Sequence, residues 1–68
     1  MKNNIERYKW KKNIKIKHQK ILANKIGVSE FYLSKIVNRH LTCPKRTALV
    51  IANGIDENRK LEDFFEKV

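Results

Sequence analysis

Apolar residues recur at helical spacing in the middle of the chain. Ile21, Leu22 and Ile26 give the spacing of one helix face over residues 18–26. Gly27 follows at once, and glycine readily adopts the left-handed conformation that ends a helix. The pattern therefore predicts a helix that stops at this glycine.

A second amphipathic pattern begins after a very short connection. Leu33, Ile36 and Val37 form an apolar stripe over residues 30–38. Ser29 precedes the stripe and is a good N-cap, because its hydroxyl accepts a hydrogen bond from a free amide of the first turn. Two helices joined by so few residues are typical of a helix-turn-helix.

The residues that connect these helices favour a close crossing of the two. Ala23 is small enough for the next helix to pass over it, and Gly27 takes a positive φ without penalty. We expect Val28, Leu33 and Ile36 to point inward. The side chains then left on the outer face of the second helix are Ser29, Glu30, Phe31, Ser34, Lys35 and Asn38.

The segment before the helix-turn-helix gives a mixed signal. We predict a helix over residues 3–13, followed by a short extended stretch through Lys17. The extended stretch is favoured because Trp10, Ile14 and Ile16 alternate with polar residues, which is the period of a strand.

The segment after the helix-turn-helix predicts two more helices. Pro44 suits the first turn of a helix, which Asn53-Gly54 would end. A last helix over residues 57–67 would be capped by Asp56.

Phe64 and Phe65 are adjacent, so one helix cannot turn both rings toward the same core. We expect one ring to pack inward and hypothesise that the other makes a dimer contact.

The charge of the chain points to an anionic partner. The 68 residues make one domain, 1–68, with 16 Lys+Arg against 7 Asp+Glu. Residues 1–53 carry 13 basic and 2 acidic side chains, whereas residues 54–68 carry 3 basic and 5 acidic ones. Such a field attracts nucleic acid, an anionic membrane surface or an acidic protein, although a purely solubilising surface also fits the charge.

The helix-turn-helix core, residues 19–38, resembles that of the XRE family, which includes phage Cro and lambda-type repressors. The similarity rests on Gln19, Leu22-Ala23, Ile26-Gly27-Val28-Ser29, Leu33 and Ile36, and further on Asn38, Pro44, Ala48, Ile51-Ala52 and Phe64. It implies an all-α, five-helix, lambda-repressor-like domain. Three features depart from the family: Arg39 stands where glycine is usual, His18 stands where threonine is frequent, and residues 1–17 fit the first helix of the family poorly.

The resemblance also implies roles in binding double-stranded DNA, with helix 30–38 in the major groove. The implied base-reading residues are Ser29, Glu30, Phe31, Ser34 and Lys35. The expected phosphate contacts are Gln19, Tyr32, Asn38, Arg39, His40, Lys45 and Arg46.

Several of these residues have an alternative interpretation that needs no DNA. Phe31 could be a core aromatic, and Glu30 could stabilise the positive end of its own helix. Tyr32 suits a phosphate contact and the core equally. The lysine run of residues 9–17 predicts either a contact with flanking or minor-groove DNA, or an ordinary solvated face.

No residue pattern indicates catalysis, a metal or a cofactor, and we expect none of the three. His18, His40 and Cys43 are scattered and have no fourth ligand for zinc, so Cys43 is expected to be a plain turn residue. A lone cysteine, no apolar run of membrane length and no signal peptide suggest a cytoplasmic protein.

The leading functional hypothesis is therefore a transcriptional regulator, a Cro-like repressor that binds its operator as a homodimer. Two alternatives remain: the antitoxin of a toxin–antitoxin pair, and a protein-interaction module that uses the same fold.

Overall fold

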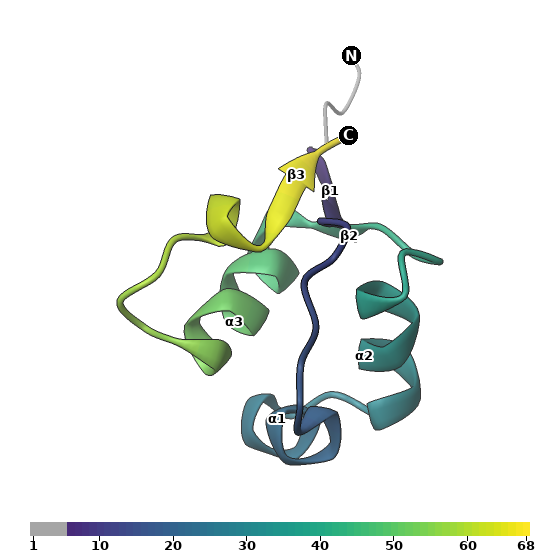
Figure 1. The fold of residues 1–68 in the computed structure, drawn as a ribbon, viewed down its shortest axis with the longest axis vertical. Helices are drawn as coiled ribbons and strands as arrows, with labels where there is room; N and C mark the ends of the chain where they lie inside the picture. The colour runs from purple at the N-terminus through teal and green to yellow at the C-terminus, as the bar shows by residue number, and fades with distance from the viewer. Residues whose placement is uncertain (1–5) are drawn as a thin grey trace.

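The computed structural model describes residues 6–68, which form three α-helices and a small sheet (Figure 1). The elements are β1 (Arg7–Trp10), α1 (Gln19–Ile26), α2 (Glu30–Val37), β2 (Cys43–Pro44), α3 (Lys45–Ile55), the 3-10 turn η1 (Leu61–Asp63) and β3 (Phe65–Lys67). The prediction of a five-helix, all-α domain is therefore wrong, because both terminal helices are replaced by strands.

The sheet joins the two ends of the described chain. Its three strands are antiparallel in the order β2-β1-β3. Tyr8 lies opposite Cys43 on one side and Lys67 on the other, and Trp10 lies opposite Phe65. Figure 1 shows β1 and β3 side by side at the end of the molecule remote from α1.

The predicted helix over residues 3–13 is a strand in its described part, and residues 3–5 lie outside the described residues. Tyr8 and Trp10 are buried, whereas Arg7 is exposed and Lys9 is half-buried. This alternation matches the pleat of a strand, in which successive side chains point to opposite faces. Beyond Trp10 the chain runs without regular structure to α1, apart from a turn at residues 12–13.

The predicted helix over residues 57–67 is also wrong, since its place is taken by η1 and β3. Phe64 and Phe65 are both buried, against the expectation that only one would pack inward. The stacked ring of Phe64 lies 5.8 Å from Trp10, and that of Phe65 meets Trp10 edge-on at 5.2 Å. Both rings can pack against the Trp10 indole because the backbone changes from a 3-10 turn to a strand between Asp63 and Phe65. Neither ring is left for a dimer contact.

The core lies between the sheet and the three helices, around Trp10. Cys43, expected to be a plain turn residue, is fully buried in β2 and belongs to this core. Burial raises the pKa of its thiol, which favours the protonated form. The buried apolar residues are Tyr8, Trp10, Leu22, Ala23, Leu33, Ile36, Cys43, Ala48, Ile51, Ala52, Leu61, Phe64 and Phe65.

The three central helices lie where the sequence predicts them, with one change at the end of α3. That helix continues through Gly54 to Ile55 rather than stopping at Asn53-Gly54. A Cβ at Gly54 would lie 2.5 Å from Cγ2 of Ile26 and 2.9 Å from Cδ1 of Leu22. Gly54 is therefore a point where α1 approaches the α3 backbone closely, not a helix terminator.

Candidate nucleic-acid interface

The turn between α1 and α2 is fixed by hydrogen bonds within its own few residues. Gly27 has φ +81°, and its N–H donates to the Ala23 carbonyl at 2.9 Å. The Val28 N–H reaches the same carbonyl at 3.0 Å. The Ser29 hydroxyl accepts from the Tyr32 N–H at 3.0 Å, so both predicted caps are confirmed.

Core packing sets which face of α2 points outward. Leu33 and Ile36 are fully buried, and Ala23 of α1 is buried beside them. Val28 and Tyr32 are half-buried and pack against the same core. A helix held by two buried side chains one turn apart cannot rotate about its axis, so the opposite face is presented in a fixed orientation.

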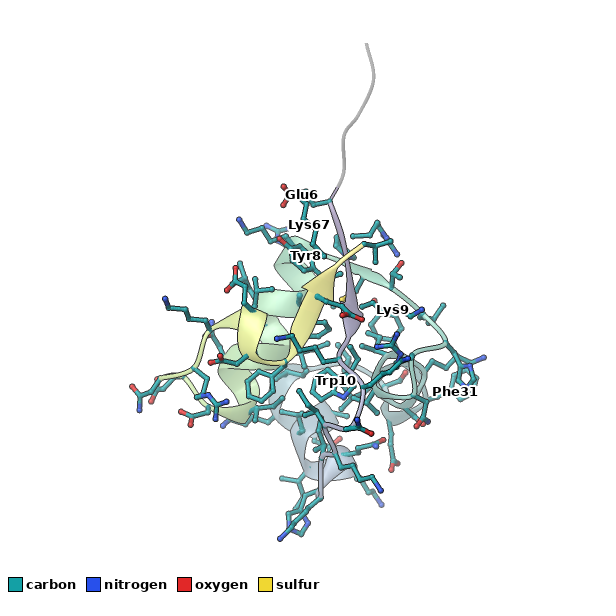
Figure 2. The ribbon with its side chains drawn as sticks, turned by 45° about the horizontal axis from the view of Figure 1, so that its top comes forward. Glu6, Tyr8, Lys9, Trp10, Phe31 and Lys67 are labelled. Carbon is teal, nitrogen blue, oxygen red and sulfur yellow. The ribbon has the colours of Figure 1, made fainter. Side chains whose placement is uncertain are left out.

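Phe31 projects from the outward face of α2 and is 71% exposed. The interpretation of Phe31 as a core aromatic is therefore wrong, and Figure 2 shows its ring pointing away from the ribbon. Lys35 lies one turn further along α2, with its ammonium 5.0 Å from the centroid of the Phe31 ring. This cation–π geometry holds an apolar surface and a positive charge side by side.

The neighbouring polar residues of α2 are partly engaged by local hydrogen bonds. The Ser29 hydroxyl caps the helix, and the Ser34 hydroxyl accepts from the Asn38 side-chain amide at 3.2 Å. Each hydroxyl keeps its own proton to donate. Glu30 is exposed at the first turn, where its carboxylate also interacts favourably with the helix dipole.

The start of α1 and the end of α2 share one hollow. It has a volume of about 210 Å³, and its polar lining is Gln19, Asn38 and Lys15. Neither an N-cap side chain nor an acidic residue occupies the first turn of α1. Its free amides are thus open to an anion. Sequence reasoning did not single out Lys15, because nothing in a run of lysines marks the one that folds back beside Gln19.

A second hollow extends from the start of α1 to the start of α2. Its polar lining comprises Lys17, His18, Gln19, Lys20 and Glu30. The two hollows meet at Gln19, so basic residues border both sides of the α1 N-terminus.

The side chain of Arg39 forms hydrogen bonds within the protein. It follows α2 with φ +67°, and one guanidinium nitrogen, Nη1, donates to the Trp10 carbonyl at 2.6 Å and to Glu66 Oε2 at 3.0 Å. The contact of Arg39 with a phosphate stays a prediction. In the free protein its side chain ties the end of α2 to β1 and β3, a role that sequence reasoning missed.

The remaining predicted phosphate contacts lie around the loop after α2. His40 is exposed, and its N–H donates to the Lys35 carbonyl at 2.9 Å. Lys45 and Arg46 are exposed on the first turn of α3, at the other end of the loop. Tyr32 is half-buried and packs against the core.

Glu6 and Glu66 form ion pairs at the sheet, and Asp63 forms one just before β3. Among residues 6–68 three ion pairs are formed: Arg39–Glu66 and Arg59–Asp63 at 3.0 Å, and Lys67–Glu6 at 2.9 Å. The hydrogen bond from Lys67 lowers the pKa of Glu6, and that from Arg59 lowers the pKa of Asp63. Figure 2 shows Glu6 and Lys67 together at the sheet end, remote from Phe31. Lys15, Lys17, Lys20 and Lys35 form no ion pair within residues 6–68.

Within residues 6–68, no cluster of histidine, cysteine or acidic side chains has the geometry to hold a metal ion. None of the helices in this range has the length and apolar character needed to cross a membrane. No protein-family model, curated protein or solved structure matches the chain.

Proposed function

We propose that this protein is a sequence-specific, double-stranded DNA-binding transcriptional regulator, with α2 as the helix that enters the major groove. The observation that carries the proposal is the rigid outward presentation of Phe31 and Lys35 from α2. The resemblance of residues 19–38 to the XRE family, including lambda-type repressors, supports the same assignment.

The dimensions of α2 suit this role. An α-helix with its side chains is about 10–12 Å in diameter, and the major groove of B-DNA is about 12 Å wide, so α2 can enter the groove. Ser29, Glu30 and Phe31 are exposed, so the first turn of α2 is accessible to base edges.

Each outward side chain has a base group that it fits. Lys35 would donate to O6 or N7 of guanine, and the apolar ring of Phe31 would pack on a thymine methyl. Glu30 would accept a hydrogen bond from N4 of cytosine. The hydroxyls of Ser29 and Ser34 would donate hydrogen bonds to acceptor groups on the bases.

Phosphate contacts would position the helix. Gln19 and the free amides of α1 would bind one phosphate, with Lys15 beside them in the same hollow. These contacts should make affinity fall with salt, at a log–log slope of about −0.9 per neutralised phosphate.

A second candidate function is favoured by the exposure of Phe31. Exposed aromatic residues next to a cation are common anchors of protein interfaces. The same face could therefore bind an acidic protein, as a protein-interaction module. This candidate predicts no binding to duplex DNA at physiological salt.

Selection of ligands from a random duplex library, at about 150 mM salt, tests the proposal. A homodimeric regulator should yield a two-fold symmetric motif with half-sites about 34 Å apart. A single short motif would indicate binding as a monomer. Recovery of no motif would overturn sequence-specific binding and favour the protein-interaction module.

A further inference from the structure

A third recessed surface adjoins the two hollows at the start of α1, and shares Lys15 with one and Lys17 and His18 with the other. It is an apolar groove of about 320 Å³ between the segment 14–18, α1 and the end of α3. Its apolar lining includes Trp10, Ile14, Ile16, Ile21 and Phe64.

The inner wall of the groove is aromatic and well supported. Trp10 and Phe64 stack at 5.8 Å, and the Trp10 indole N–H donates to the Ile14 carbonyl at 2.8 Å. That bond holds the segment 14–18 beside the groove. Ile21 forms part of the α1 side and is 65% exposed, so its apolar surface is accessible to a ligand in the groove.

The rim of the groove is positively charged. Lys15, Lys17 and Lys25 line it together with His18, and no acidic residue does. The Lys25 ammonium donates to the Gly54 carbonyl at 3.1 Å, which fixes it at the α3 side of the opening. An apolar recess with only cations around it matches a ligand that has an apolar body and one negative group.

We propose that this groove binds one small anionic amphiphile, such as an aliphatic or aromatic carboxylate. The volume lies at the low end of the range for small-molecule sites, about 300–1,000 Å³. A stable protein interface needs about 800 Å² from each partner, which a recess of this size does not supply. The apolar body would lie against Ile14, Ile16 and Ile21, above the buried rings of Trp10 and Phe64, and the carboxylate would meet the lysine rim.

Ligand binding should also be coupled to the DNA site, a consequence that rests on the proposed function. Lys15 lines both this groove and the hollow of Gln19 and Asn38. A carboxylate bound at Lys15 would compete with a phosphate for the same charge. The ligand should therefore weaken DNA binding, and DNA should weaken ligand binding by the same factor.

Titration of the free protein with decanoate tests the site without any DNA. Trp10, the single tryptophan, lies in the groove wall and reports occupancy by its fluorescence. We expect one-to-one binding with a Kd of about 0.1–1 mM, the range for a ligand of about 12 non-hydrogen atoms at modest efficiency. Decanol, which has the same chain without the charge, should bind at least about tenfold more weakly, because the rim contributes through its charge.

Two variants locate the binding. Ile21→Glu places a carboxylate on the groove wall and should reduce decanoate affinity at least about tenfold. Leu49→Glu makes the same change at an exposed position of α3 outside the groove and should leave the affinity unchanged. Circular dichroism of each variant verifies that the fold is retained.

Three results would overturn the site: no binding up to several times the expected Kd, equal loss in both variants, or decanol binding as tightly as decanoate. If the chain failed to bind duplex DNA, only the coupling would be lost, because the titration uses the free protein. With a DNA-binding protein, an operator affinity unaffected by saturating decanoate would refute the coupling alone.

Discussion

The helix-turn-helix and the sheet are built in opposite ways. The turn between α1 and α2 is closed by bonds between near neighbours, as from Gly27 to Ala23 and from Tyr32 to Ser29. The sheet depends on distant residues, and its Lys67–Glu6 ion pair joins positions 61 apart. The first region is defined locally, whereas the second exists only when both ends of the chain meet.

The aromatic residues of the two regions differ in the same way. Phe31 is exposed on α2, while Trp10 is 1% exposed under the sheet. This contrast indicates that the sheet end stabilises the domain, whereas the helix-turn-helix leaves an aromatic side chain on the surface that the proposed function assigns to DNA binding. Substitutions at the two aromatics should therefore separate stability from binding.

The largest expected effect is that of Trp10→Ala, which empties the centre of the core. We expect a loss of about 3–5 kcal/mol in the free energy of unfolding, enough to unfold a small domain. Phe31→Ala, as the matched control, should change stability by less than about 0.5 kcal/mol. Urea denaturation followed by far-UV circular dichroism measures both. Equal stability losses in the two variants would break the contrast between the regions.

Arg39 connects the two regions, because its side chain donates hydrogen bonds from the end of α2 to the Trp10 carbonyl and to Glu66. Arg39→Ala should cost about 1–3 kcal/mol through the lost charged hydrogen bonds. Arg39→Gly loses the same bonds but removes the penalty of a positive φ, so it should be about 1 kcal/mol more stable than Arg39→Ala. Identical midpoints for the two variants would show that φ at this position carries no penalty.

Gly54 is the position at which α1 packs closely against α3. Gly54→Ala should destabilise the protein by about 1 kcal/mol, because the close approach of Ile26 and Leu22 outweighs the higher helix propensity of alanine. The neighbouring Asn53→Ala, at an exposed site, should instead be neutral or slightly stabilising. Thermal unfolding of the pair provides the comparison. A gain in stability for Gly54→Ala would mean that the helices can separate freely.

The smallest expected effect concerns the exposed ion pairs of the sheet end. Hydrogen bonds lower the pKa values of Glu6 and Asp63 below their ordinary values of 4.5 and 3.8. Their stabilisation is therefore present above those ordinary values and is lost as pH falls through the lowered ones. We expect a small decrease in the urea midpoint between about pH 5 and pH 3. Glu6→Gln with Asp63→Asn should flatten this decrease; an unchanged slope would assign it to other carboxylates.

Sequence patterns predicted the locally defined region well. Gly27, Ser29 and the stripe of Leu33 and Ile36 carry their structural consequences within a few residues, so α1 and α2 lie as expected. Strands β1 and β3 were missed because each depends on a partner at the other end of the chain. The available signal for β1 was the alternation of apolar Tyr8 and Trp10 with basic Arg7 and Lys9, whereas the alternation beyond Trp10, through Ile16, lies outside any strand.

The candidate site divides in a similar way. The outward position of Phe31 and Lys35 follows from helix periodicity and could be predicted. The internal role of Arg39 and the place of Lys15 beside Gln19 could not, because both depend on tertiary contacts of the N-terminal segment.

The central claim is that α2 reads duplex DNA while the sheet end only supports it. The most direct test is the affinity of the selected duplex for Phe31→Ala and Lys35→Ala, measured by fluorescence anisotropy. Leu49→Ala and Lys60→Ala, exposed positions outside α2, are the matched controls. We predict losses of about 5- to 150-fold for the α2 variants, which corresponds to about 1–3 kcal/mol per base contact, and of less than about twofold for the controls. Equal affinities across all four variants would contradict the claim.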